Sequence, residues 1–320
     1  MLNKHMSLHL RAKKKQLCLT KKSDLRYGEN PHQKAAFYQL PSKNGVTNFT
    51  QHHGKELSYN NMIDFEAAYQ LVREFSEPTA VVIKHTNPCG VAVAETIDQA
   101  YQNAYDCDPV SAFGSIVGLN RPVDEQTAEK IQAHFVEVII APSFTKEALN
   151  RLTKKRSLRL IELEMKKPQH EIGYRFVQGG LLVQQTDINP EDQTNEVVTT
   201  EKPNQESEKD LQLANIIVKH VKSNAIVIVK EGQLIGTGAG QMSRVKSVQI
   251  ALEQAGEKAN GAVMASDAFF PFKDSVELAA KANIAAIIQP GGSKRDDESI
   301  QACNENNIAM VMTKVRHFKH

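Results

Sequence analysis

A lysine and a histidine stand side by side where an apolar run ends, in the segment Lys84-His85-Thr86-Asn87-Pro88-Cys89-Gly90. His85 can move protons near neutral pH, and Lys84 offers a cation or, if desolvated, a general acid or base. Adjacent residues on an extended segment point in opposite directions, so a turn must reorient one of them if both serve one site. The pair predicts acid-base chemistry at a strand end, with a structural Lys-His pair as the alternative.

Cys89 in the same segment allows two further interpretations. Zinc-dependent nucleobase deaminases carry His-x-Glu and Pro-Cys-x-x-Cys motifs, and Pro88-Cys89 matches half of the second. However, Asn87 rather than a glutamate stands two residues after His85, and no second cysteine lies near Cys89. A nucleophilic thiolate would need a nearby base, which spacing alone does not show. A packing cysteine is therefore the preferred interpretation.

The glycine-rich run from Gly236 to Arg244 is expected to link a strand to a helix, with a turn at 236–240. It matches the dinucleotide-binding motif G-x-G-x-x-G poorly, because its glycines alternate and no acidic partner follows a second strand at the usual spacing. A glycine loop at a helix N-terminus can still hold an anionic or flat ligand, and Arg244 could pair with a carboxylate or phosphate. The alternative is a tight turn with a solvent-facing Arg244.

Polar and aromatic side chains gather in three more segments, 25–33, 266–272 and 316–320. Such segments usually only cover a surface or fill a small satellite core. An arginine or lysine next to an aromatic ring nevertheless suits an anionic, planar ligand. The run Phe269-Phe270-Pro271-Phe272 would pack well on a flat heterocycle.

Alternating helices and strands must position these segments. Helical spacing follows Asn60, and further helices are expected at 96–105, at 209–221 and from Ser243. Buried strands are expected at 79–83, 91–94, 115–119, 137–141, 158–162, 225–229, 262–266, 285–289 and 309–312. This order predicts an α/β protein with three α/β/α layers, in which loops at the strand ends form the ligand sites.

The order of elements repeats after a polar connector between Thr186 and Ser207, which indicates two divergent halves. We expect an N-terminal linker remnant at 1–23, a first half at 24–195 and a second half at 196–320. Crevices between the halves, or between subunits, are the natural ligand sites.

Bulk composition limits the partners of this chain of 320 residues. Its formal net charge is only +2, so no global field attracts nucleic acid or an anionic membrane, and the basic residues near the N-terminus lack a recognisable binding module. No apolar run reaches the roughly twenty residues of a membrane span. The four cysteines have no paired or metal-ligand spacing, which favours a reducing compartment, the cytoplasm, and argues against structural zinc.

Ten collinear segments between Asp24 and His320 together resemble the aminoimidazole carboxamide ribotide (AICAR) transformylase domains of bifunctional purine biosynthesis enzymes. Members of that family normally carry an IMP cyclohydrolase domain before the first of these segments. Only residues 1–23 stand there in this chain, so no cyclohydrolase activity is expected of it. The segments are LRYGENPHQ, SYNNMIDFEAAYQLV, KHTNPCG, DPVSAFGSIV, VEVIIAP, RFVQGGLL, KSNAIV, IGTGAGQMSRV, SDAFFPF and RHFKH.

The resemblance implies tandem cytidine-deaminase-like halves without the deaminase zinc, and a homodimer whose sites draw on both subunits. It also implies a formyltransferase of IMP biosynthesis that moves a formyl group from 10-formyltetrahydrofolate to the 5-amino group of AICAR. That amine is a weak nucleophile, so a proton must leave during attack. The resemblance places His85 to relay this proton and Lys84 to stabilise the oxyanion or protonate the departing folate nitrogen. Which residue does which stays open.

Further site residues are implied by the same resemblance, and Glu137 stands where an aspartate is also familiar in the family. The substrate-binding set is Arg26, Tyr27, Asn61, Phe113, Glu137, Asn224, Phe269, Arg316 and Phe318. The folate-binding set is Arg244, Val245, Pro271 and Ser293. Two other classes of protein remain as alternatives, a zinc nucleobase deaminase and a non-catalytic dimerising subunit.

Overall fold

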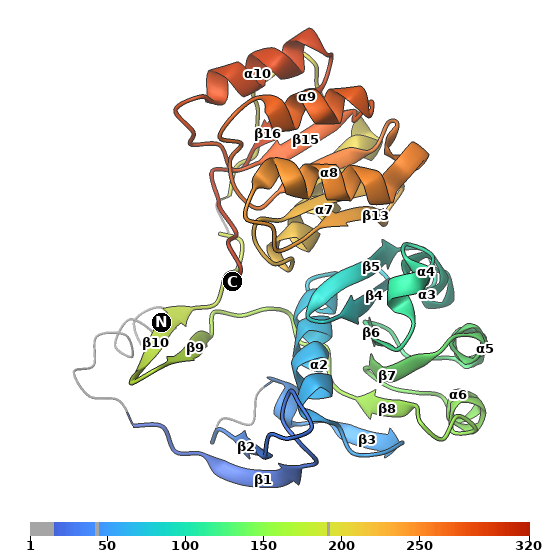
Figure 1. The fold of residues 1–320 in the computed structure, drawn as a ribbon. Coiled ribbons are helices and arrows are strands. Elements are labelled where there is room, and N and C mark those ends of the chain that lie inside the picture. The colour runs from blue at the N-terminus through green and yellow to red at the C-terminus, as the bar shows by residue number, and fades with distance from the viewer. Residues whose placement is uncertain (1–15, 42–44, 191–192) are drawn as a thin grey trace.

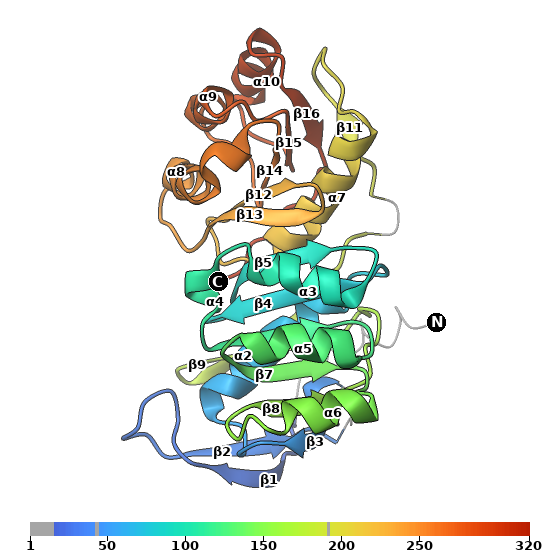
Figure 2. The same ribbon diagram turned by 90° about the vertical axis from the view of Figure 1, so that its right-hand side faces the viewer.

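A single mixed sheet of twelve strands runs through the computed structural model, which describes residues 16–41, 45–190 and 193–320. The strand order is β11-β16-β15-β14-β12-β13-β5-β4-β6-β7-β8-β3. Figures 1 and 2 show that the two halves of the chain build the two ends of this sheet. They meet where Gln233 of β13 pairs antiparallel with Ala92 of β5. The α/β class predicted from the sequence is confirmed.

Within the described ranges, the first half contributes six strands to the sheet, together with five α-helices. The strands are β3 (Thr50–His53), β4 (Thr79–Lys84), β5 (Asn87–Val93), β6 (Ser115–Leu119), β7 (Val136–Ala141) and β8 (Arg159–Glu162). The helices are α2 (Tyr59–Val72), α3 (Ile97–Tyr105), α4 (Pro109–Ala112), α5 (Glu125–Ala133) and α6 (Lys146–Leu152).

The second half repeats this order, with a short 3-10 helix, η2 (Gly256–Ala259), after its second α-helix. Its strands are β11 (Glu196–Val197), β12 (Ile226–Lys230), β13 (Gln233–Gly238), β14 (Val263–Ser266), β15 (Ala286–Gln289) and β16 (Ala309–Met312). Its α-helices are α7 (Gln205–Lys219), α8 (Arg244–Ala255), α9 (Asp274–Lys281) and α10 (Asp296–Glu305). In both halves a hairpin is followed by strands that pair parallel to one another.

Helices cover both faces of the sheet and create the three layers predicted from the sequence. The helices α2 and α7 share one continuous apolar core with one face, while the other face carries two separate cores under the remaining long helices. The strands are buried on both faces, which is why they are rich in valine and isoleucine. Side-chain caps fix where α2 and α7 begin, since Ser58 accepts from the Asn61 N–H and Asn204 from the Ser207 N–H.

Two hairpins stand outside the main sheet, and the sequence analysis did not predict them. One pairs β1 (Thr20–Leu25) with β2 (Ala35–Gln39), and the other pairs β9 (Ile172–Val177) with β10 (Gly180–Gln185). Part of the linker expected at 1–23 is therefore strand, because Thr20 already belongs to β1; residues 1–15 lie outside the described part of the chain. The small 3-10 helix η1 (Gly45–Thr47) precedes β3.

Two connections expected from the sequence are shorter than predicted. The strand β5, expected from residue 91, already begins at Asn87, so that only two residues separate it from β4. Likewise Gly236 and Gly238 lie within β13 rather than in a ligand loop. A Cβ atom on Gly236 would lie 2.2 Å from the Ala251 carbonyl oxygen of α8. These glycines therefore serve close packing of a strand against a helix.

None of the helices in the described ranges is both long enough and apolar enough to cross a membrane.

Candidate active site

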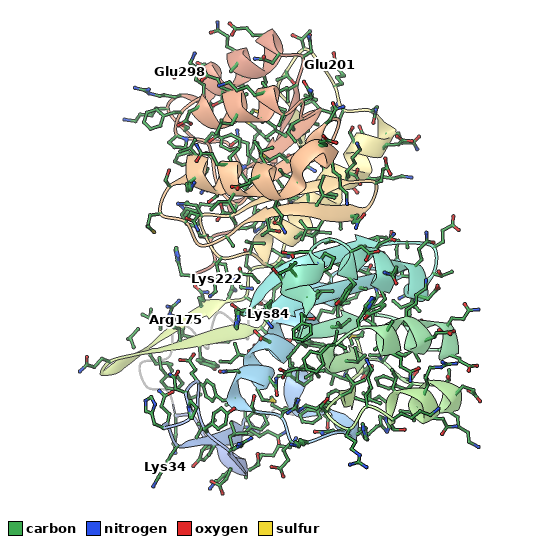
Figure 3. All side chains as sticks on the ribbon, turned by 45° about the vertical axis from the view of Figure 1, so that its right-hand side comes forward. Lys34, Lys84, Arg175, Glu201, Lys222 and Glu298 are labelled. Atoms are coloured by element: carbon green, nitrogen blue, oxygen red, sulfur yellow. The ribbon has the colours of Figure 1, made fainter. Side chains whose placement is uncertain are left out.

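The predicted motifs converge on one edge of the sheet, at the boundary between the two halves. There β4 ends, β5 begins, β13 ends and β12 begins. The Lys222 N–H donates to Asn87 Oδ1 at 3.0 Å and so ties the Lys-His segment to the second half within one chain. Figure 3 shows Lys84 and Lys222 at this boundary.

The catalytic pair predicted from the sequence lies where β4 turns into β5, with Lys84 as the last residue of β4 and His85 in the turn. Lys84 pairs with Asn87 across the hairpin, so His85 and Thr86 form the entire turn. Both have left-handed backbone conformations, with φ of 49° and 65°. Type I′ hairpin turns require such angles and normally use Asn or Gly, and each left-handed non-glycine residue costs about 1–3 kcal/mol. The turn breaks the strand alternation that would point Lys84 and His85 apart.

Two backbone carbonyls hold the Lys84 side chain. Its Nζ donates to the Phe113 oxygen at 2.8 Å and to the Gly114 oxygen at 3.3 Å. The Phe113 ring is 62% exposed and lies 4.7 Å, centroid to centroid, from the Phe135 ring. The cation and an accessible aromatic surface are therefore adjacent, as a planar, electron-rich ligand would require.

Asn61 and Glu137 lie together on the same half. Asn61 completes the capping box of α2 by accepting from the Ser58 N–H, and its Nδ2 donates to Glu137 Oε2 at 3.1 Å. The same carboxylate oxygen lies 3.8 Å from Arg159 Nη1. Both predicted residues are thus brought together, and each already has protein partners.

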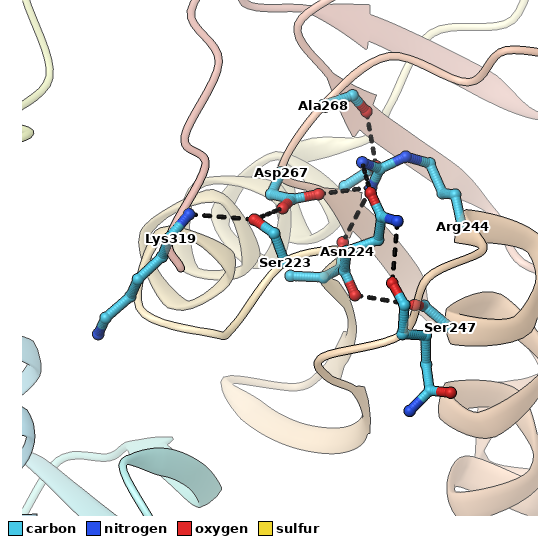
Figure 4. Close-up of polar contacts among 10 residues, drawn as sticks. Ser223, Asn224, Arg244, Ser247, Asp267, Ala268 and Lys319 are labelled. Carbon is cyan, nitrogen blue, oxygen red and sulfur yellow. Dashed lines mark hydrogen bonds and ion pairs between the residues drawn. The ribbon is translucent and has the colours of Figure 1, made fainter. Parts of the chain in front are cut away.

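A buried ion pair organises the second half of the site (Figure 4). The Arg244 guanidinium forms a short ion pair with Asp267 Oδ1, donates to Ser266 Oγ at 2.9 Å, and donates to Asn224 Oδ1 at 2.7 Å. Asn224 also donates through Nδ2 to the Gln241 oxygen. Because Arg244 is only 7% exposed, the alternative of a solvent-facing arginine is wrong.

The C-terminal tail is hydrogen-bonded to this network through Ser223. The Ser223 hydroxyl donates to Asp267 Oδ2 at 2.5 Å and accepts from the Lys319 N–H at 3.0 Å, while the Ser223 N–H donates to the Lys319 oxygen. Burial, assisted by the charge of Lys222, lowers the pKa of Lys319 to about 8. The Arg316 guanidinium lies 4.4 Å from the centroid of the Phe318 ring.

A pocket of about 260 Å³ opens beside this network, and Asn224 and Phe318 of the predicted substrate set line it. Its lining combines polar side chains with an aromatic ring and a methionine, a combination that suits a small polar ligand. The lining residues are Ser223, Asn224, Gly240, Gln241, Met242, Phe318 and His320.

The remaining predicted residues lie around this edge or on the β1–β2 side of the first half. Arg26 stacks over Tyr27 at 5.4 Å just after β1. Phe269, 37% exposed, and Pro271 follow β14, whereas Ser293 follows β15 and its Oγ accepts from the Arg295 N–H. The ends of two adjacent parallel strands are thus near one another, where ligands bind in open α/β sheets. Val245 lies in the first turn of α8.

Cys89 packs against the apolar core under α3, as the sequence interpretation expects. Burial raises the pKa of its thiol to about 12, so it carries a proton at neutral pH. Among the residues that the structure describes, no three His, Cys, Asp or Glu side chains are grouped to bind a metal.

Sequence reasoning missed Ser223, Gln241 and Asp267 as parts of the site. Each lies inside or beside a segment that the sequence analysis selected. However, no sequence pattern predicts the hydrogen-bond partners of a serine or glutamine in a loop. Asp267 follows the buried strand β14 directly, and a carboxylate at such a strand end is the one signal that could have indicated an internal partner for Arg244.

Comparisons with known proteins show to which family the chain is related. A family model described as "AICARFT/IMPCHase bienzyme" matches residues 1–254. The bifunctional purine biosynthesis protein PurH of Anoxybacillus flavithermus is 57% identical over 311 residues, which are 95% of this chain and 60% of that protein. PurH of Bacillus subtilis is 54% identical over 304 residues, which are 94% of this chain and 59% of that protein. The chain thus spans about 60% of the length of these curated relatives.

A solved structure of RibD from Acinetobacter baumannii is also similar to part of the chain, with 21% identity and a TM-score of 0.25 over 33% of this chain and 34% of that one. A likeness this limited carries no argument about the fold.

Proposed function

The chain belongs to the AICARFT/IMPCHase bienzyme family, and we propose that it is a folate-dependent formyltransferase of purine nucleotide synthesis. In this proposal it moves the formyl group of 10-formyltetrahydrofolate to the 5-amino group of AICAR. The observation that supports it most is the meeting of the His85 turn with the loop that carries Asn224, through the bond from the Lys222 N–H to Asn87. One edge then offers a proton carrier, a cation and a polar pocket.

The chemistry of the two neighbours follows from their surroundings. Lys84 Nζ donates to two carbonyl oxygens, which hold this donor group beside the turn. We therefore assign Lys84 to stabilise the oxyanion that develops on the formyl group, or to donate a proton to the departing folate nitrogen. His85 at the tip of the turn is left to accept the amine proton as the nitrogen attacks the formyl carbon.

For the ribotide, we propose contacts from both halves of the sheet edge. Asn224 and Phe318 line the pocket, and Phe113 and Phe269 present exposed rings that suit the imidazole heterocycle. Arg26, Tyr27 and Arg316 supply charge and hydrogen bonds for the phosphate and carboxamide. Asn61 and Glu137 complete the proposed set and act together, because they are bonded to each other.

For the folate, we propose a surface that includes Val245, Pro271 and Ser293. Arg244 stays in this set, but we assign its contribution to the backbone rather than to the side chain. Its guanidinium is committed to Asp267 and Asn224, so its contribution to folate binding would come from the backbone at the start of α8, where N–H groups favour an anion.

We further propose that the active form is a homodimer in which each site takes residues from both subunits, that its halves are cytidine-deaminase-like, and that it works in the cytoplasm without a metal cofactor. The repeated order of strands and helices supports the tandem relationship. Mixing His85→Ala subunits with Arg244→Met subunits under exchange conditions would restore part of the activity if each site used one residue from each chain. No recovery would rule out that division.

The direct test is to supply this chain alone with AICAR and 10-formyltetrahydrofolate and to follow the release of tetrahydrofolate by absorbance. Formylated ribotide should accumulate in proportion to enzyme. The Lys84→Ala variant should form it at least a hundredfold more slowly. A folded wild-type chain that binds AICAR but transfers no formyl group would reject the proposed activity for this part of the family's sequence.

A further inference from the structure

The two halves contain equivalent hairpin turns, and their comparison isolates what is special about the turn at His85. In the first half Lys84 pairs with Asn87, and in the second half Lys230 pairs with Gln233, so each turn has two residues. In the second turn Glu231 has φ of 51° and is followed by a glycine with φ of 74°. Both turns therefore have the same left-handed geometry.

An aspartate from the preceding helix anchors each turn at the same spacing. Asp64 Oδ1 of α2 accepts from the Thr86 N–H at 2.6 Å, 22 residues along the chain. Asp210 of α7 accepts from the Gly232 N–H, also 22 residues along, and from the Glu231 N–H, both at 2.8 Å. Burial raises the pKa of both aspartates, and the turn N–H groups oppose that rise. The anchor is thus a repeated part of the fold.

The residues in the turns differ in a way that concerns function. The second half places Gly232 where left-handed backbone is required, and glycine adopts it without steric cost. The first half places Thr86 there, a β-branched residue for which φ of 65° is unfavourable. A turn built only for stability would use glycine at both sites. The strained turn at the proposed catalytic residue therefore depends more on its anchor than its counterpart does.

We propose that Asp64 is a positioning residue for His85: by accepting from the Thr86 N–H it holds the strained turn in the one conformation that presents the imidazole to the substrate. This rests on the proposed formyltransferase function. Asp64 performs no proton transfer itself. Its role is to keep the histidine within reach of the reacting amine, where displacement by about 1 Å can reduce the rate about a hundredfold.

The central experiment first removes the Asp64 carboxylate and then relieves the strain in the turn that the carboxylate holds. Asp64→Ala should lower kcat by about 10- to 100-fold and leave the KM values for AICAR and folate within about threefold, since the pocket is untouched. Adding Thr86→Gly, which makes the left-handed turn free of strain as in the second half, should restore about tenfold of that loss. Asp64→Asn, which keeps an acceptor oxygen, should stay within about fivefold of wild type.

The matched control is Asp210→Ala, which removes the equivalent anchor in the second half. Its turn lies at the other end of β5, because the Val93 N–H donates to the Gly232 oxygen, so kcat should remain within about twofold of wild type. A fall as large as that of Asp64→Ala would assign both aspartates to folding alone. Wild-type kcat in Asp64→Ala, or no recovery on adding Thr86→Gly, would overturn the proposal.

Hydrogen exchange distinguishes failure of this inference from failure of the proposed function. Exchange of the Thr86 amide should accelerate at least tenfold in Asp64→Ala and return toward the wild-type rate in Asp64→Asn. If wild-type protein transfers no formyl group while this exchange pattern holds, the result supports the role of Asp64 as an anchor and rejects the proposed reaction. If Asp64→Ala does not fold, the double variant with Thr86→Gly provides the measurement, and unchanged exchange at residue 86 in it rejects the anchor.

Discussion

Two regions face each other across one sheet edge and are built in opposite ways. The turn at His85 is strained and is anchored by a bond from the Thr86 N–H to one carboxylate. The network around Asp267 is buried, and its carboxylate bonds both Arg244 and the Ser223 hydroxyl. The first region holds few groups in an unfavourable conformation, whereas the second holds many groups in favourable ones.

This difference separates two requirements of the proposed reaction. A proton carrier must reach the reacting group, so the protein tolerates local strain to present it. A binding wall must be rigid, and cross-bonded polar groups that satisfy one another give rigidity. The same sheet edge meets both requirements because the two halves, although alike in topology, use their loops differently.

The largest effect should come from removing the imidazole. His85→Ala should reduce kcat by roughly two to four orders of magnitude, while the Kd for AICAR stays close to wild type, because acid-base assistance is lost and binding contacts are kept. Glu231→Ala, the matching change in the other hairpin, should leave kcat unchanged. Steady-state kinetics and calorimetric binding decide this, and equal losses in the two variants would erase the distinction between the turns.

The next largest effect should be a loss of stability when the network around Asp267 is broken. Asp267→Ala leaves Arg244 buried without its carboxylate, which typically costs about 3–5 kcal/mol. Urea unfolding followed by circular dichroism would measure the loss. The exposed pair of Lys273 and Glu277 is the control, since Glu277→Ala should not move the unfolding midpoint. A mild effect of Asp267→Ala would mean that Ser266 and Asn224 alone suffice for Arg244.

The buried strands and the long helices could be predicted from sequence, because runs of β-branched residues and helical spacing are local signals, whereas the two outlying hairpins lack such signals. The single sheet could not, since its junction is one antiparallel pairing, between Gln233 and Ala92, that no local pattern encodes. For the same reason the partners of Arg244 were missed. The sequence around an arginine beside glycines is the same whether the side chain binds a ligand or a buried carboxylate 23 residues away.

A smaller effect should appear as pH dependence where the helices that carry the two anchors meet. Glu74, two residues after the end of α2, lies 2.8 Å from Lys219 Nζ and 3.1 Å from His220 Nε2, at the end of α7. Burial lowers the pKa of His220 to about 4. Burial alone would raise the pKa of Glu74, but its hydrogen bonds with His220 and Lys219 lower that pKa to about 2.

The sign follows from which state binds the proton first. Below about pH 6.5 His220 is protonated in the unfolded chain but remains neutral in the folded one, so the free energy of unfolding falls as the pH drops from 6.5 toward 4. Urea unfolding at pH 7 and pH 4.5 should show this fall in wild type and a flatter profile in His220→Gln. If the wild-type and His220→Gln proteins lose the same free energy of unfolding between pH 7 and pH 4.5, His220 is not the source of the acid sensitivity.

The smallest effect should come from Cys89, which lies in β5 next to the reactive turn and therefore tests whether nearness to that turn is enough for function. Its thiol donates to the Val82 oxygen, and burial keeps it protonated. Cys89→Ala should retain kcat within about twofold and lose less than about 1.5 kcal/mol of stability, because only one buried sulfur is removed. The exposed Cys18 should react with a thiol reagent in the folded protein while Cys89 does not. An inactive but folded Cys89→Ala protein would extend the reactive region from the turn into the strand, and would require a chemical step for the thiol.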